Sequence, residues 1–258
     1  MESLKILFVG NSFAEDTSKH MADIAVSLGY KTVKIAVLYV GGCSIDMHYR
    51  HACEDSAVYV YHINEGEGWS HTPEFKMSDA VKSENWDWIV IQHGTGGGSR
   101  YTDVECYENL NPLIDYIKEL APSAKIAFNL TWRGEHTFQH HEIISYGGNI
   151  ALMREKLEEV TYKVVVGNPK IDLLVPTGTA IENARTSRIG LLTRDCYHLS
   201  VDKGRYIAAL ACISTVTGID ASKVDWAPDG VDEYAKKVAF ESVKNAQLKP
   251  MEITKSAL

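Results

Sequence analysis

Three side chains of this 258-residue sequence could together perform nucleophilic chemistry. Ser12 lies in the stretch Gly-Asn-Ser-Phe, which ends a strongly apolar N-terminal run, and Asp195 and His198 lie three residues apart much later in the chain. A carboxylate at this spacing can hold the Nδ1 side of an imidazole and leave Nε2 to take a proton from a serine. Because a serine is a poor nucleophile without such a base, the three residues predict a Ser-His-Asp triad.

Each feature also has an ordinary structural interpretation. Asn11 and Ser12 both favour the N-terminal cap of a helix, where their side-chain oxygens accept from free backbone N–H groups. Asp195 and His198, taken alone, fit the cap of a surface helix at least as well. The elements that carry these residues must decide between the two interpretations.

Short apolar runs rich in β-branched residues alternate with longer amphipathic stretches along the chain. This alternation is typical of βαβ units and a mainly parallel sheet. It predicts a flavodoxin-like three-layer α/β/α sandwich with a five-stranded, mainly parallel sheet, in a single domain spanning residues 1–258. The expected strands cover residues 5–10, 33–40, 88–92, 125–132 and 172–177, and the expected helices cover residues 18–28, 109–120, 149–166, 201–217 and 231–246.

One segment departs from this alternation. Residues 57–75 alternate in polarity on both sides of a Glu-Gly-Glu-Gly turn, which predicts a β-hairpin. We expect a hairpin insertion around residues 57–77, at the edge of the sheet.

Polar residues and glycines follow all five predicted strands. In an open parallel sheet, ligands bind beyond the carboxyl ends of the strands. The same rim would therefore gather the stretches Gly-Asn-Ser at 10–12, Gly-Gly-Cys-Ser at 41–44, Gln-His-Gly-Thr at 92–95, Thr-Trp-Arg-Gly at 131–134 and Thr-Gly-Thr at 177–179. This placement favours a site at the rim that includes Ser12.

The composition argues against several classes of function. A formal net charge of −8 without a basic tract predicts that no nucleic acid is bound. Five cysteines with no Cys-X-X-Cys pair indicate neither a disulfide framework nor a zinc ribbon. His136, His140 and His141 share a polar segment, but their spacing fits no named zinc motif, so no metal site is expected.

No apolar run approaches the length of a membrane span, and the N-terminus lacks the basic and apolar regions of a signal peptide. The sequence as it stands predicts a soluble, cytoplasmic protein, or a periplasmic or secreted one if a signal peptide preceded Met1. Nothing in it indicates an oligomeric state.

Together the motifs resemble the blocks of the SGNH, or GDSL-like, hydrolase superfamily over most of the chain. Gly-Asn-Ser-Phe stands where that family has its Gly-Asp-Ser nucleophile block, Gly-Gly-Cys-Ser resembles the second block, and Asp-Cys-Tyr-His-Leu-Ser resembles the last block. More narrowly, the stretches GNSFAEDT, GGCSIDMHY, DWIVIQ and NLTWRGE look like a branch of uncharacterised SGNH-type proteins.

The resemblance implies ester hydrolysis by acyl transfer, with no metal or organic cofactor. Ser12 would attack the ester, His198 would act as base and then as acid, and Asp195 would orient the imidazole. The oxyanion would be bound by the backbone N–H groups of Ser12 and Gly42 and by the side-chain amide of Gln92. Gln92 stands where the family usually has an asparagine, and it resembles the glutamine that some carbohydrate O-acetylesterases of the superfamily use.

The implied substrate is a small-molecule or carbohydrate ester with a small acyl group, such as an O-acetylated sugar. Trp132 offers a flat apolar face to a sugar ring, although an aromatic residue here is more often part of the core. His93 and Thr95 follow Gln92 directly and would line the same pocket.

Two other functions stay open at this point. A flavodoxin-like module would bind a phosphate or a flavin with the small hydroxylic residues of GNSFAEDT at a helix N-terminus. Against it, Glu15 and Asp16 would repel phosphate, and neither Asp195 nor His198 would have a role. The other alternative is an SGNH-like protein that binds glycans without turnover.

Overall fold

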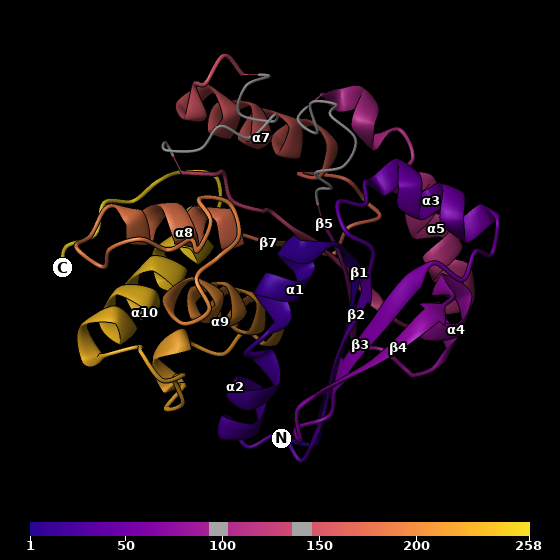
Figure 1. Cartoon of the computed structure of the whole chain (residues 1–258), viewed down its shortest axis with the longest axis horizontal. Helices are drawn as coiled ribbons and strands as arrows, with labels where there is room; N and C mark the ends of the chain where they lie inside the picture. Colours follow the sequence, from indigo (N-terminus) through magenta and orange to yellow (C-terminus); the bar gives the residue numbers. More distant parts are fainter. Residues whose placement is uncertain (93–102, 136–145) are drawn as a thin grey trace.

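A seven-stranded sheet lies at the centre of the computed structural model, which describes residues 1–92, 103–135 and 146–258 (Figure 1). The strand order is β4-β3-β2-β1-β5-β6-β7. The strands are β1 (Ser3–Gly10), β2 (Thr32–Tyr39), β3 (Tyr59–Asn64), β4 (Trp69–Phe75), β5 (Trp88–Gln92), β6 (Lys125–Asn129) and β7 (Leu173–Val175).

The five strands β2, β1, β5, β6 and β7 run parallel, which confirms the predicted fold class. The predicted count of five strands is wrong, because the antiparallel pair β3 and β4 is hydrogen-bonded to β2 and extends the same sheet. Most of β4 is exposed, and its residues include a histidine, a glutamate and a proline. Such residues suit a free sheet edge, since they discourage pairing with another chain.

Helices cover both faces of the sheet. The described helices are α1 (Ser12–Ser18), α2 (Met21–Ser27), α3 (Ile45–Cys53), α4 (Met77–Lys82), α5 (Leu110–Leu120), α7 (Ile150–Val164), α8 (Thr177–Arg185), α9 (Lys203–Thr217) and α10 (Glu233–Leu248), with the short 3-10 helices η2 (Val104–Tyr107) and η3 (Ala221–Lys223). Figure 1 shows α1, α2 and α8 to α10 on one side of the sheet and α3 to α5 on the other.

The strands are buried on both faces, which explains their nearly continuous apolar runs. In β1, Ile6 and Phe8 pack with α1, α2, α8, α9 and α10, whereas Leu7 and Val9 pack with α3, α4 and α5. These two cores make the predicted three-layer sandwich.

Four predicted helices agree with α5, α7, α9 and α10 to within three residues at each end. The helix predicted over 18–28 corresponds to α2, and it is preceded by a separate helix, α1, which begins directly after the first strand at Ser12. The predicted strands over 125–132 and 172–177 are shorter in the structure, because the chain leaves the sheet after Asn129 and enters α8 at Thr177.

Helix α9 packs closely against the segment that precedes it. A Cβ at Gly204 would lie 2.3 Å from the carbonyl oxygen of Leu192 and 3.0 Å from the side chain of Leu199. A glycine at this position therefore lets the helix approach the chain that carries Asp195 and His198.

Within the described ranges, none of the helices combines the length and the apolar character that a bilayer span requires.

Candidate active site

Ser12 is the first residue of α1, at the carboxyl end of β1. Asn11 caps the helix, and its Oδ1 accepts from the backbone N–H of Phe13 at 3.0 Å. A Cβ at Gly10 would lie 2.6 Å from the Cβ of Ala14, so glycine makes room for this sharp turn. The capping role suggested by the sequence thus belongs to Asn11, and the hydroxyl of Ser12 is left for another contact.

The structure brings Ser12, Asp195 and His198 together. The Nε2 of His198 lies 2.9 Å from the Oγ of Ser12, and the Nδ1 lies 2.7 Å from the Oδ2 of Asp195. Because an ionised carboxylate can only accept hydrogen bonds, Nδ1 carries the proton and Nε2 accepts from the serine hydroxyl. This is the arrangement in which an imidazole can take a proton from a serine.

Asp195 is held in this orientation by its own turn. Its Oδ1 accepts from the backbone N–H groups of Tyr197 at 3.0 Å and His198 at 2.6 Å. Burial acts to raise the pKa of Asp195, but the hydrogen bonds from His198 and from the Tyr197 backbone outweigh it and hold the pKa below its ordinary value. The carboxylate is therefore ionised at neutral pH.

The turn that carries this pair is tight. The backbone N–H of Arg194 donates to the carbonyl of His198 at 2.9 Å, and Thr193 forms an antiparallel bridge with Leu199. Cys196 has a φ of +64°, in the left-handed region that costs a residue with a side chain about 1 kcal/mol. Such strain persists only where surrounding contacts hold the backbone in place.

Contacts from the end of β6 hold the middle of this turn. The indole N–H of Trp132 donates to the carbonyl of Tyr197 at 2.8 Å, and the backbone N–H of Glu135 donates to the carbonyl of Cys196 at 2.7 Å. Trp132 is only 1% exposed and packs edge-on against Phe13, with ring centroids 4.6 Å apart. Trp132 therefore has the packing role that the sequence left open, and it supports the turn from inside the protein.

Asp16 holds the two ends of the turn. Its Oδ2 accepts from the backbone N–H of Leu199 at 2.8 Å, and its Oδ1 accepts from Arg194 at 2.9 Å and from Arg205 at 2.7 Å. The sequence alone indicates Asp16 only as a charge that would repel phosphate. The sequence does place Asp16 one helical turn after Ser12, which could have indicated a role at the site. Its partners, however, lie 178 to 189 residues further along the chain.

Gly42 lies in the loop between β2 and α3, where it adopts a left-handed φ of +63° that favours glycine. The side-chain amide of Asn11 donates to the carbonyl of Cys43 at 3.1 Å and so ties this loop to the turn that precedes Ser12. The two backbone segments predicted to bind an oxyanion are thus joined by Asn11.

Gln92 ends β5, and its side chain belongs to a buried network of amides. Its Nε2 donates to the Oδ1 of Asn11 at 2.9 Å, and its Oε1 accepts from the Nδ2 of Asn129 at 3.4 Å. Asn129 also donates to the hydroxyl of Thr17 at 3.3 Å. This network gives a reason for asparagine in the Gly-Asn-Ser block: Asn11 both accepts and donates, and an ionised aspartate could not donate to Cys43.

The remaining predicted site residues, His93 and Thr95, lie outside the described residues, as do His136, His140 and His141. Among the described residues, no group of three or more histidines, cysteines, aspartates or glutamates is placed to hold a metal ion.

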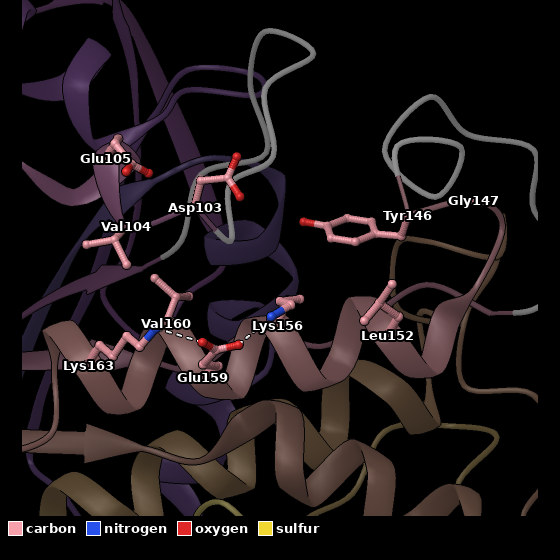
Figure 2. A pocket seen from close by; sticks show the side chains of 10 residues that line it. All are labelled: Asp103, Val104, Glu105, Tyr146, Gly147, Leu152, Lys156, Glu159, Val160 and Lys163. Carbon is pink, nitrogen blue, oxygen red and sulfur yellow. Dashed lines mark hydrogen bonds and ion pairs between the residues drawn. The ribbon is translucent and has the colours of Figure 1, made fainter.

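A cavity of about 500 Å³ lies between η2 and α7. Figure 2 shows Asp103 and Tyr146 facing each other across it, with the ion pairs of Glu159 with Lys156 and Lys163 along α7. The ten residues drawn in Figure 2 include neither Ser12 nor its two partners.

Comparison with known proteins agrees with this architecture. Residues 5–246 match a family model described as a domain of unknown function, DUF4886. A DUF4886 family protein from Bacteroides uniformis has a similar structure, with a TM-score of 0.90, 29% sequence identity and 98% of both chains covered. A search of curated proteins found no match.

Two more distant structures share the fold at a TM-score of 0.50 and 16% identity. One is a candidate acylhydrolase from Bacteroides fragilis, with 83% of this chain and 86% of that chain covered. The other is a candidate GDSL-like lipase from Parabacteroides merdae, with 83% and 97% covered. The fold is therefore that of the GDSL-like, or SGNH, hydrolases, which confirms the resemblance seen in the motifs.

Proposed function

The chain belongs to the DUF4886 family, and we propose that it is a serine esterase that hydrolyses small acyl esters. The observation that carries this proposal is the pair of contacts made by His198, with Ser12 at 2.9 Å from Nε2 and Asp195 at 2.7 Å from Nδ1. A nucleophile, a base and an orienting carboxylate in this order are the parts that acyl transfer to serine requires.

In the proposed reaction, the Oγ of Ser12 attacks the ester carbonyl carbon while its proton passes to the Nε2 of His198. The tetrahedral intermediate then expels the alcohol, which takes that proton as the carbon–oxygen bond breaks. Water then attacks the acyl-enzyme in the same way and gives its proton to His198. When the bond to Oγ breaks, the carboxylic acid leaves and Ser12 takes that proton back. Asp195 stays ionised throughout, because its pKa is lowered by its hydrogen bonds, and it stabilises the imidazolium.

The negative oxygen of the intermediate needs donors at the rim. We propose the backbone N–H groups of Ser12 and Gly42 together with the side-chain amide of Gln92. That amide has two N–H groups, one of which donates to Asn11, so the other would serve the oxyanion. A single preorganised donor of this kind contributes about 3 kcal/mol to lowering the barrier.

The substrate we propose is an O-acetyl group on a carbohydrate. The motif resemblance supports this choice, since glutamine stands at the third block as it does in some carbohydrate O-acetylesterases. His93 and Thr95 would contact the sugar. The phosphate-binding alternative has no support from the site, because the hydroxyl of Ser12 is paired with an imidazole that is itself paired with a carboxylate.

A labelling experiment tests the proposal. The protein is treated with a fluorophosphonate, the modified peptide is mapped, and hydrolysis of p-nitrophenyl acetate and of acetylated sugars is measured. We expect the label on Ser12 and loss of both labelling and hydrolysis in Ser12→Ala. Ser18→Ala is the matched control, because Ser18 lies on the same helix and its hydroxyl donates to the carbonyl of Glu15.

Two outcomes would contradict the proposal. Labelling at another residue with full activity in Ser12→Ala would remove the triad. A protein that is inert toward every ester but binds glycans would favour the non-catalytic alternative.

A further inference from the structure

Beyond the triad, α1 contributes a second polar residue to the site. We infer that Asp16 is a positioning residue that holds the turn carrying Asp195 and His198 at the correct distance from Ser12. This inference rests on the proposed esterase function, and it assigns Asp16 no contact with the substrate.

The contacts of Asp16 converge on both ends of that turn. Arg194 precedes Asp195 directly and donates to the Oδ1 of Asp16, while Leu199 follows His198 directly and donates its backbone N–H to Oδ2. Arg194 also donates to the carbonyl of Leu199, which closes the turn on itself. One carboxylate therefore fixes the entry and the exit of the segment that carries the proposed base.

The position of Asp16 on α1 connects these contacts to the nucleophile. Residues four apart on a helix lie on the same face, so Asp16 stands one turn below Ser12. Ser12 is thus connected to Leu199, the neighbour of His198. The connection runs through one helical turn, the carboxylate of Asp16 and the backbone N–H of Leu199. Few rotatable bonds lie along this path, so it can fix the distance between Ser12 and His198.

Burial makes this carboxylate expensive to keep. The side chain of Asp16 is fully buried, and Arg205, which donates to it at 2.7 Å, is only 10% exposed. Removing an ion from water is strongly unfavourable, and apolar residues of similar volume often stabilise a fold as well or better. Stability alone therefore does not require a buried charge at this position. We expect it to serve the geometry of the site instead.

The test compares Asp16→Asn with wild type and with Glu84→Gln. Asparagine keeps the shape of Asp16 but turns an NH2 group toward either Leu199 N–H or a guanidinium, both of which are donors. Glu84 also accepts from two basic side chains, Lys5 and Lys34, but at the other end of the sheet. Arg194→Gln is the second variant, because its side chain is 35% exposed and its replacement leaves Arg205 to neutralise Asp16.

Two readouts are measured well below the melting temperature of each variant. The first is kcat and KM per active site, with active sites counted by fluorophosphonate titration. The second is the low-field proton resonance of His198 Nδ1–H, which reports the contact with Asp195 and needs no turnover. A loss of stability alone would change neither quantity in the molecules that stay folded.

In Asp16→Asn we expect kcat to fall about 100-fold with KM little changed, the size of effect that a misplacement of about 1 Å produces. The Nδ1–H resonance should broaden or disappear, Arg194→Gln should show a smaller change in the same direction, and Glu84→Gln should match wild type in both readouts.

A folded Asp16→Asn protein with wild-type kcat and resonance would overturn the inference. If that variant does not fold, an unchanged kcat and resonance in Arg194→Gln would overturn it instead. Failure of the proposed function is recognised separately, by a wild-type protein without esterase activity or by an active Ser12→Ala. In that case the resonance alone decides whether Asp16 positions the turn.

Discussion

Glu84 at the amino end of the sheet and Asp16 at its carboxyl end are both carboxylates that accept from two basic side chains. Glu84 pairs with Lys5 and Lys34 where β1 and β2 begin, and all three side chains stay about one-fifth exposed. Asp16 pairs with two arginines and a backbone N–H and is fully buried. The carboxylate therefore keeps some contact with water at one end of the sheet and has none at the other.

The difference fits the proposed function, which would constrain the carboxyl end of the sheet. An ion pair in contact with solvent contributes about 0 to 1 kcal/mol and tolerates change, whereas breaking a buried pair costs about 3 to 5 kcal/mol. At the carboxyl end, the buried amides of Asn11, Gln92 and Asn129 add further polar groups that must all be satisfied. A rim with so many buried polar groups is costly for stability but holds side chains in one arrangement.

Asp195→Asn should have the largest effect and would test whether the carboxyl end is catalytic at all. An asparagine cannot fix the Nδ1–H tautomer as an ionised carboxylate does, so kcat should fall about 10,000-fold. The measurement is steady-state hydrolysis of p-nitrophenyl acetate, with circular dichroism to show that the fold is kept. Unchanged turnover in Asp195→Asn would leave the two ends of the sheet functionally equal and would break the comparison.

Gln92→Ala should have the next largest effect, and Asn129→Ala is its matched control. Both residues belong to the same buried network, so each substitution should lower the free energy of unfolding by about 1 to 3 kcal/mol. Only Gln92 is proposed to donate to the oxyanion, and its loss should also lower kcat about 100-fold with little change in KM. Equal kcat values in the two variants, at similar melting temperatures, would assign Gln92 to structure alone.

The strand ends and the Asp195 and His198 pair could be predicted because they depend on local patterns. Parallel strands bring their carboxyl ends to one rim, and an i, i+3 spacing in a turn brings the two side chains together. The role of Asp16 could not be predicted, since it depends on Arg194 and Arg205, which approach it only in the folded chain.

The sequence predicts a hairpin at the edge of the sheet, but the predicted count of five strands does not include its two strands. Its own alternation defines β3 and β4, whereas the pairing of β3 with β2 depends on which edge of the sheet is open. Similarly, Asn11 was expected to be a cap, and its contacts with Gln92 and Cys43 depend on how three strand ends meet. Features set by neighbouring residues, such as a turn or a cap, can thus be predicted from the sequence. Contacts between segments that are distant in the chain cannot.

The variant His48→Gln would test, through the free energy of unfolding, what a buried polar group near the carboxyl end of the sheet costs. His48 lies on α3, which begins at the rim, and it is buried 3.0 Å from the hydroxyl of Tyr59. Burial, with a smaller contribution from His51, lowers the pKa of His48 to about 3. Between pH 6.5 and pH 3 the unfolded chain takes up a proton that the folded protein does not, so the free energy of unfolding falls as the pH falls.

From pH 7 to pH 5 this linkage should lower the free energy of unfolding by about 2 kcal/mol, and His48→Gln should remove that part of the acid sensitivity. Urea unfolding of both proteins at the two pH values measures it. If the free energy of unfolding depends on pH in the same way in both proteins, then burying His48 does not lower stability in acid.

Glu84→Gln should have the smallest effect, because its ion pairs lie partly in water. We expect the free energy of unfolding at pH 7 to fall by less than about 1 kcal/mol and kcat to stay unchanged. Hydrogen bonds from Lys34 and Lys5 lower the pKa of Glu84, so the stabilisation is present above the ordinary glutamate pKa and is lost as the pH falls through the lowered value. Thermal melting of both proteins at pH 7 and pH 3 should therefore show a gap that closes in acid, and added salt should also narrow it. If kcat fell as much in Glu84→Gln as in Asp16→Asn, the amino end of the sheet would constrain the site too. The difference in burial between the two carboxylates would then not predict which of them matters for catalysis.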